Sequence, residues 1–190
     1  MLFRSRPTPN AGHRALLTVE SAGRLRGLIT QNVDGLHLDA GHSADKVHEV
    51  HGSWRDSLCW ECGDRRPMRE AVQRVVDGDP DPACLLCGGI LKSATILFGE
   101  SLEPAVIGAA MDAAEDCDLF LAVGSTLSVG PVNNAVPRAK QAGARIVILN
   151  AESTAMDRFA DALVLGSIGE FLPRLLAPLA VRARRAEPGG

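Results

Sequence analysis

Residues 118–150 read DLFLAVGSTLSVGPVNNAVPRAKQAGARIVILN, and they contain the clearest evidence of the fold. Two apolar runs with the length of buried strands, 118–124 and 144–150, enclose a segment at 131–143 whose pattern favours a helix. Pro137 should perturb that helix, because proline lacks the backbone N–H. A strand–helix–strand unit joins parallel strands, so the sequence predicts an α/β fold with a parallel sheet covered by helices on both faces.

The same alternation continues on both sides of this stretch. Residues 9–23 are typical of a helix with Asn10 at its start, and residues 24–30 form a short apolar run that favours a strand. Towards the C-terminus, a predicted strand at 162–166 precedes a helical pattern at 167–180. The whole chain therefore fits one α/β architecture.

Composition narrows the class of protein. The chain has 190 residues, is 46% hydrophobic and carries a net charge of −3, which fits one globular domain with or without a small module. Mixed, slightly acidic charge and 4% aromatic residues argue against nucleic-acid binding. The sequence has no apolar signal core and no run of transmembrane length, so we expect a cytoplasmic location without membrane contact.

Two cysteine pairs interrupt the alternation. Cys59-x-x-Cys62 and Cys84-x-x-Cys87, separated by 21 residues, can place four thiolates around one zinc ion. Two disulfides or four unrelated core cysteines are the alternative, and reduced cytosolic thiols favour the metal. Because four ligands fill the tetrahedral shell, the ion should be structural. Cys117 is left over and is predicted to be a buried thiol.

Polar side chains cluster where three predicted strands end. Such strand ends are where open α/β sheets bind ligands, and small hydroxyls, amides and backbone N–H groups suit phosphate and ribose. Each cluster alone is explained by a turn or a helix cap, but three together predict a nucleotide-sized ligand. The clusters are Gln31, Asn32 and Asp34; Ser125 and Thr126; and Asn150 and Glu152.

The order of the motifs matches a known family. The chain, from about Pro9 to Leu176, resembles the sirtuins, the NAD-dependent protein deacylases, and the match implies a Rossmann-like parallel sheet, truncated at its N-terminus, with a small zinc-binding module inserted. The motifs are TQNVDGLH (30–37), VHGS (50–53), the two CxxC pairs, LFGE (97–100), VGSTLSV (123–129) and ILNAE (148–152). By this reading, residues 1–52 and 99–178 form the Rossmann-like part, 53–98 the zinc module and 179–190 a disordered tail.

The resemblance also implies roles for individual residues. His51 corresponds to the catalytic base, and the four cysteines correspond to the ligands of a structural Zn²⁺. Phe98, Gly99, Glu100 and Val129 would line the cleft for the acyl-lysine protein or peptide, which pairs as an added strand. The NAD-binding residues would be Gln31, Asn32, Val33 and Asp34 at the nicotinamide and its ribose; Gly124, Ser125 and Thr126 near the adenosine; Asn150, Ala151 and Glu152 at the adenosine ribose; and Ile168 near the adenine.

The implied reaction explains why these residue types are needed. The acyl oxygen attacks the ribose carbon that bears nicotinamide, nicotinamide leaves, and a base then takes a proton from a ribose hydroxyl. Histidine suits that step because its charge changes near neutral pH. The remaining histidines have plainer readings: His13 as a capping or surface residue, His37 in packing or in shaping the pocket, and His42 and His48 as solvated loop residues.

One departure from the family pattern matters. The chain lacks the Gly-rich segment GAGxSxxSGIPDFR, whose backbone amides hold the NAD pyrophosphate at a helix N-terminus. Three explanations are possible: Met1 is internal to a longer protein, the chain is a truncated gene product, or it is a shortened protein that binds another ligand. We favour the first two. Losing charge-assisted hydrogen bonds of roughly 1.5–3 kcal/mol each should weaken NAD binding by orders of magnitude, and the sheet should lack a central strand.

Two functions of different classes therefore remain. One is an NAD-dependent protein-lysine deacylase, and the other is a catalytically impaired remnant that acts as a zinc-stabilised peptide-binding or protein-binding module. His51, Asn32 and Asp34 favour the enzyme, whereas the absent Gly-rich segment favours the remnant. The acyl preference, the protein substrate, the choice between deacylation and ADP-ribosyl transfer, and the oligomeric state do not follow from the sequence.

Overall fold

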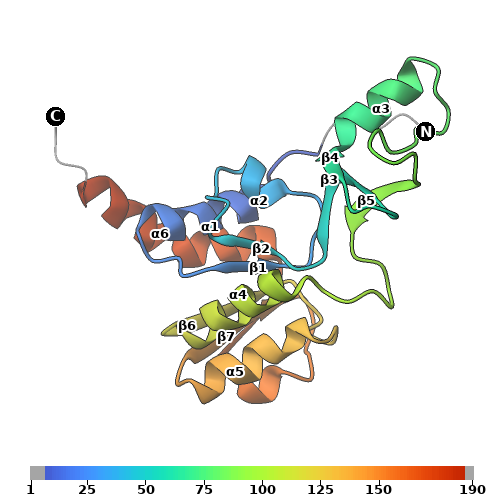
Figure 1. The fold of residues 1–190 in the computed structure, drawn as a ribbon. Coiled ribbons are helices and arrows are strands. Elements are labelled where there is room, and N and C mark those ends of the chain that lie inside the picture. The colour runs from blue at the N-terminus through green and yellow to red at the C-terminus, as the bar shows by residue number, and fades with distance from the viewer. Residues whose placement is uncertain (1–6, 187–190) are drawn as a thin grey trace. The chain divides into compact units, whose positions relative to one another are not determined.

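The computed structural model describes residues 7–186, and these form two compact units (Figure 1). The large unit contains the described chain up to Ile29, then Leu36–His48, then the chain from Pro104 onward. The small unit contains Thr30–Gly35 and Glu49–Glu103. The small unit is thus larger than the predicted module at 53–98, because it also takes in the QNVD loop and His51.

A parallel three-stranded sheet forms the centre of the large unit, as the sequence predicted. Its strands are β6 (Leu119–Val123), β7 (Arg145–Asn150) and β8 (Ala162–Leu165), in the order β6-β7-β8. Both pairings are parallel, with Leu119 opposite Arg145 and Val147 opposite Ala162. The central strand β7 is the most buried, since it is flanked by strands on both sides.

Helices cover both faces of this sheet. Side chains alternate along β7, so Ile146 and Ile148 point to one face and Leu149 to the other. The first face packs against α4 (Pro104–Glu115) and α5 (Ala135–Gln141), and the second against α1 (Ala11–Ser21) and α6 (Ile168–Ala186). The half-buried Cys117 lies against the first of these cores.

Local sequence accounts for two of the helix ends. The side chain of Asn10 accepts hydrogen bonds from the backbone N–H groups of Gly12 and His13, which caps α1 as predicted. Pro137 is the third residue of α5, behind a short 3₁₀ turn at Val132–Asn134. The N–H groups of a first turn have no partner within the helix, so proline is tolerated there and the expected perturbation stays at the helix entrance.

A second, two-stranded sheet pairs β1 (Leu28–Thr30) with β2 (Val47–Glu49), joined by the helical turn α2 (Leu36–Asp39). The N–H of Leu28 donates to the carbonyl of Lys46, and the N–H of Val50 donates to the carbonyl of Thr30. Within residues 7–186, neither strand is hydrogen-bonded to the three-stranded sheet.

The small unit is built on an antiparallel sheet that the sequence did not predict. Its strands are β3 (Gly52–Cys59), β4 (Arg65–Pro67) and β5 (Leu91–Thr95), in the order β4-β3-β5, and α3 (Met68–Val76) follows β4. The pairing of β3 with β5 is interrupted between Ser53 and Ser57, where three residues of β3 bulge out. β4 and β5 have three and five residues, and the longer β3 is rich in polar residues, so none of these strands forms the apolar run that would predict it.

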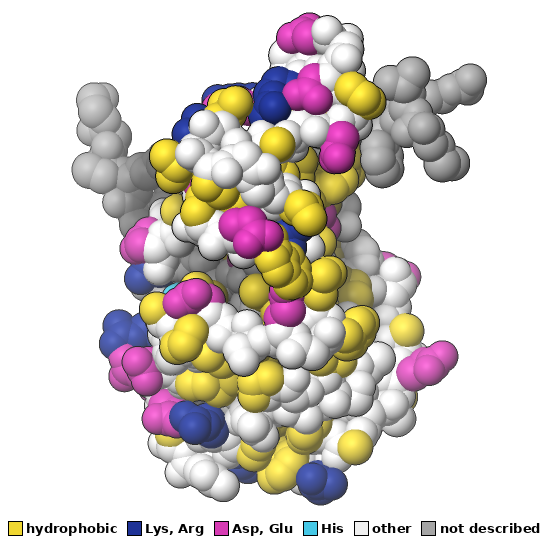
Figure 2. All heavy atoms as spheres, turned by 45° about the vertical axis from the view of Figure 1, so that its right-hand side comes forward, with side chains coloured by type: hydrophobic (Ala, Val, Ile, Leu, Met, Phe, Trp, Pro, Cys, Tyr) yellow, Lys and Arg dark blue, Asp and Glu magenta, His cyan; other side chains and the backbone are white. Residues whose placement is uncertain are grey.

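The C-terminal helix corrects one prediction. Helix α6 continues through Ala186, so a disordered tail does not begin at residue 179, while residues 187–190 lie outside the described chain. None of the helices within the described residues has the length and apolar character needed to cross a membrane. Basic and acidic side chains are interspersed on the face shown in Figure 2, as the mixed composition led us to expect.

Candidate functional site

The four paired cysteines converge in the small unit. Cys59 ends β3, Cys62 follows in the turn, and Cys84 and Cys87 lie in the loop before β5, with all four Sγ atoms within 4.8 Å of one another. The Cys59–Cys87 and Cys62–Cys84 sulfur distances are 3.5 and 3.7 Å. Tetrahedral zinc with Zn–S bonds of ~2.3 Å requires sulfurs about 3.8 Å apart, so this arrangement fits a zinc ion closely.

The electrostatics of the four thiols also favour a cation. Hydrogen bonding from the backbone N–H of Cys62 lowers the pKa of the Cys59 thiol to about 7. The backbone N–H of Asp64 acts in the same direction on Cys62, but hydrogen bonds with the other thiols, together with burial, raise the pKa of Cys62 to about 12. Four thiolates this close repel one another, and a divalent cation removes that repulsion.

His51, the predicted base, stands between β2 and β3 in the small unit. Its Nδ1 lies 3.2 Å from the backbone carbonyl of Gln31. A carbonyl only accepts, so Nδ1 carries the proton and Nε2 holds the free lone pair in the neutral ring. The neighbouring Gly52 has a φ of +73°, and a Cβ there would stand 2.1 Å from the carbonyl of Ala94. The glycine of the HG pair is therefore required by the close approach of β5.

The bulge in β3 supports the loop that carries Asn32, Val33 and Asp34. The backbone N–H of Trp54 donates to the Val33 carbonyl at 3.1 Å, and its indole N–H donates to the Asp34 carbonyl at 2.9 Å. The Arg55 guanidinium donates to the carbonyl of the next loop residue, Gly35, at 2.7 Å. Bulges often redirect residues next to functional sites, and neither Trp54 nor Arg55 was predicted from the sequence to have a role here.

The segment predicted to bind the peptide follows β5, and its first residue, Ile96, is hydrogen-bonded to His51. The N–H of Ile96 donates to the carbonyl of His51 at 2.9 Å. Phe98 is fully exposed, Gly99 adopts a φ of +92°, and the carboxylate of Glu100 turns back onto the segment, accepting from the N–H of Leu97. The small unit thus brings together the predicted base, the QNVD loop and the predicted substrate residues 98–100.

The remaining predicted NAD residues lie in the large unit: most follow the ends of β6 and β7, and Ile168 begins α6. Asn150 is buried, and its carboxamide holds the backbone of Ser125 in both directions: Oδ1 accepts from its N–H at 3.0 Å, and Nδ2 donates to its carbonyl at 2.7 Å. Gly124 has a φ of +59°, and a Cβ there would stand 2.4 Å from Ile168. Asn150 and Ile168 therefore meet the two ends of the same short segment, 124–125.

The loop after β6 contains a strained residue, Leu127, that the sequence pattern does not reveal. Leu127 adopts a φ of +53°, although its side chain is buried in the core below. Its N–H donates to the Ser125 hydroxyl at 3.1 Å, and the hydroxyls of Thr126 and Ser128 lie 2.8 Å apart. A non-glycine residue held in this region marks a loop whose shape is imposed by its surroundings. Val129, Ala151 and Glu152 are exposed at the same strand ends.

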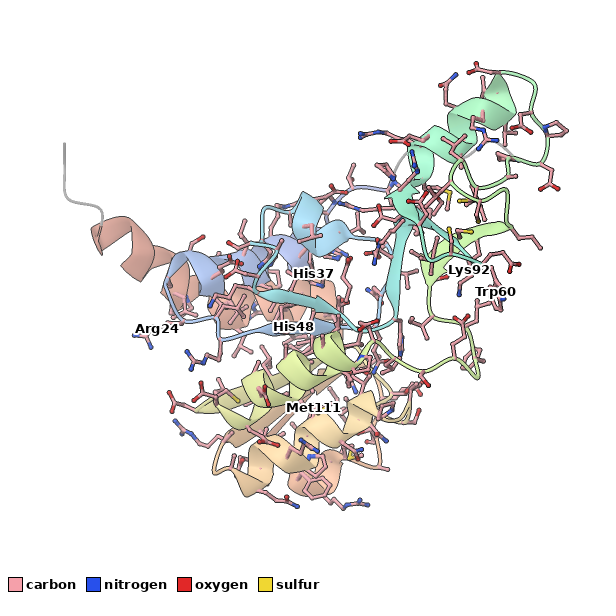
Figure 3. All side chains as sticks on the ribbon, in the orientation of Figure 1. Arg24, His37, His48, Trp60, Lys92 and Met111 are labelled. Carbon is pink, nitrogen blue, oxygen red and sulfur yellow. The ribbon has the colours of Figure 1, made fainter. Side chains whose placement is uncertain are left out.

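Two other histidines, His42 and His48, are more buried than the sequence led us to expect. His42 is buried, and its Nδ1 lies 2.6 Å from Glu20, so it is not a solvated loop residue. The His37 ring contacts those of His13 and His42, with centroids 4.7 and 5.6 Å apart and the ring planes inclined at 55° and 66°. His48 is half-buried, and burial lowers its pKa below the ordinary 6.5. His37 and His48 are labelled in Figure 3. These side chains help to pack the large unit.

Fold and motifs together define an α/β protein with a four-cysteine small unit and strand-end polar loops. The Sir2 family model matches residues 1–131, and the chain belongs to the Sir2 family. A protein of Streptomyces coelicolor named NAD-dependent protein deacetylase 2 is 47% identical over 90% of this chain. The chain spans 71% of that relative and 64–68% of the length of four others.

Solved structures of the family are similar in fold. The protein Sir2Af2, bound to a myristoylated histone peptide, is 36% identical with a TM-score of 0.80, and the match covers 95% of this chain and 75% of that one. A Sir2 protein with a p53 peptide and NAD⁺ is 27% identical with a TM-score of 0.83, covering 92% of this chain and 71% of that one.

Proposed function

We propose that this chain is an NAD-dependent protein-lysine deacylase, which transfers the acyl group of a modified lysine to ADP-ribose and releases nicotinamide. The observation that carries the proposal is His51: its Nδ1 is held by the Gln31 carbonyl, and its own carbonyl binds the segment that presents Phe98. A positioned base next to a peptide-binding segment, in a chain of the Sir2 family, fits this reaction best.

The polar groups of the predicted cofactor residues are of the kinds that bind NAD. Glycine, serine, threonine and asparagine lie at the carboxyl ends of parallel strands, where α/β sheets bind nucleotides. We assign Gln31, Asn32, Val33 and Asp34 to the nicotinamide side, and Gly124, Ser125, Thr126, Ala151, Glu152 and Ile168 to the adenosine side. We assign Asn150 to the adenosine side as well, through the Ser125 backbone that it holds.

NAD, when bound, supplies the ribose carbon that accepts the acyl oxygen and loses nicotinamide. The chain contributes the proton transfer. Because Nδ1 of His51 donates to the Gln31 carbonyl, Nε2 keeps its lone pair and takes a proton from a ribose hydroxyl. The loop at 31–35 keeps its shape through Trp54 and Arg55 of β3, so the base and the loop that faces nicotinamide are parts of one rigid unit.

The substrate class follows from the same unit. A myristoylated histone peptide and a p53 peptide are bound in two related Sir2 structures, and we propose an acyl-lysine protein or peptide as the substrate of this chain. An extended peptide would add to the segment after β5, along Phe98, Gly99 and Glu100 of the small unit. We also assign Val129, in the large unit, to peptide binding. Zinc, held by four thiolates, stabilises the unit without entering the reaction. We place the reaction in the cytoplasm, where such thiols stay reduced.

The test is nicotinamide release from NAD in the presence of an acetyl-lysine peptide. His51→Ala should reduce turnover by about 10²–10⁴-fold, the usual contribution of a general base, while zinc content stays unchanged. His48→Gln is the matched control, since His48 is also half-buried but packs within the large unit. Equal turnover in wild type and His51→Ala would refute the assignment. Peptide binding without any turnover in the wild type would favour a non-catalytic binding module instead.

A further inference from the structure

The segment Leu97–Glu100 is an exposed turn that needs support to keep one conformation. Leu97 and Phe98 are exposed apolar side chains, and Gly99 is free to adopt many backbone conformations. An exposed turn with a glycine and a large apolar tip should sample many shapes, and ordering it costs conformational entropy. Something in the small unit must therefore hold this turn if it is to present Phe98 in one orientation.

Glu100 closes the turn on itself. Its carboxylate Oε2 accepts from the N–H of Leu97 at 2.7 Å, while its own N–H donates to the Leu97 carbonyl at 3.0 Å. The two bonds join the ends of the turn. Glu100 thus faces inward, and its side chain shapes the segment on which Phe98 stands.

Lys92, on β5, holds that carboxylate in place. Its Nζ donates to Oε1 and Oε2 of Glu100 at 2.6 and 2.8 Å, and it lies 3.4 Å from the Thr95 carbonyl. The ammonium also lies 5.0 Å from the centre of the Trp60 ring, and the two side chains are neighbours in Figure 3. The side chains of Lys92 and Glu100 are only 18% and 27% exposed, so water screens the pair less than it screens a surface ion pair.

The electrostatics agree with this geometry. The N–H of Leu97 and the ammonium of Lys92 both lower the pKa of the Glu100 carboxyl, so Glu100 is charged at neutral pH.

Both ends of the segment are anchored to functional parts of the unit. Lys92 pairs with Leu58 in the sheet, next to the pairing of Leu91 with the zinc ligand Cys59. At the other end, the N–H of Ile96 donates to the His51 carbonyl. The turn is therefore connected to the metal site through Lys92 and to the predicted base through Ile96.

We propose that Lys92 is a positioning residue for the acyl-lysine substrate: through Glu100 it fixes the Leu97–Gly99 turn so that Phe98 meets the peptide in a single orientation. This inference rests on the proposed deacylase function and adds a residue outside the peptide cleft to it. Lys92 does not touch the substrate itself. Its effect reaches the peptide and leaves NAD binding unchanged.

The test measures two dissociation constants by calorimetry, one for an acetyl-lysine peptide and one for NAD, with zinc content measured in parallel. Lys92→Met keeps most of the stem over Trp60 and removes the ammonium. We expect peptide binding to weaken about ten- to hundredfold, with NAD affinity and zinc unchanged, because small displacements of positioning groups have effects of that size. Lys92→Arg should restore much of the peptide affinity.

The large unit offers a matched control. Lys140 donates to both carboxylate oxygens of Asp161 at 2.7 Å, and Asp161 also accepts a backbone N–H, that of Ile146. These contacts have the same pattern as those of Lys92 and Glu100 but belong to the large unit, so Lys140→Met should leave both dissociation constants unchanged.

The outcomes separate this inference from the proposed function. A wild-type chain that binds no acetyl-lysine peptide overturns both, whereas Lys92→Met with wild-type affinity overturns the inference alone. Equal weakening of peptide and NAD also overturns it, since that indicates a general structural role. If Lys92→Met loses zinc, Lys92→Gln decides: weaker peptide binding with zinc and NAD affinity retained supports the inference, and unchanged peptide binding refutes it.

Discussion

The two units are stabilised in different ways. In the large unit, Ile146, Ile148 and Leu149 are fully buried between helices on both faces of the sheet. In the small unit, helix α3 has no buried residue, and the most buried positions include the cysteines Cys59 and Cys84 and small polar serines. An apolar core supports one unit, and a four-thiolate site takes much of that role in the other.

This difference bears on function. The predicted base and the predicted peptide segment both belong to the unit with the smaller apolar core. Zinc takes no part in the proposed reaction, yet β3, which begins directly after His51, ends at the zinc ligand Cys59. Loss of the metal should therefore disturb the chemistry through the shape of the unit, while the large unit keeps its own core.

Zinc removal should produce the largest effect. Binding of structural zinc is worth about 10–16 kcal/mol in small metal-dependent folds, so Cys84→Ser should release zinc and unfold the small unit. Proteolysis and hydrogen exchange should then locate the damage within 49–103, with the sheet of β6, β7 and β8 still protected. Unchanged zinc content in Cys84→Ser would refute the four-cysteine site, and uniform loss of protection would refute the independence of the two units.

Asn150→Ala should have a smaller effect, confined to the large unit. It leaves the N–H and carbonyl of Ser125 without their partner, and an unsatisfied buried group costs about 1–3 kcal/mol. We expect NAD affinity to fall because the 124–126 segment loses its shape, with peptide affinity largely retained. Calorimetry with each ligand separates the two. A greater loss of peptide binding would move the adenosine site elsewhere.

Acid should act weakly on the large unit through His48. Burial holds its folded pKa below 6.5, so the unfolded chain takes up the proton first. The stability that neutral His48 contributes is present above pH 6.5 and declines as the pH falls below that value. Thermal unfolding of the zinc-loaded protein between pH 7 and 5 should show a smaller decline in His48→Gln. An identical decline in both proteins would exclude His48 as the source.

Part of the site could be anticipated because it depends on local order. The CxxC spacing placed four sulfurs within reach of one ion, and the residues after the apolar runs fell at strand ends. Contacts between distant residues could not be anticipated. Trp54 and Arg55 donate hydrogen bonds to a loop 20 positions earlier in the chain. His42 lies in a polar loop, yet it is buried and hydrogen-bonded to Glu20, 22 positions away.

The parallel sheet, the helices around it and the zinc ligands could be predicted from the amino-acid sequence, because apolar periodicity and ligand spacing are properties of neighbouring residues. The antiparallel sheet of the small unit, the inward turn of Glu100 onto Lys92 and the hold of the Asn150 carboxamide on Ser125 are visible only in the folded chain. These features depend on which polar groups meet when distant segments pack, and a hydrogen bond between such groups leaves no periodic pattern in the chain.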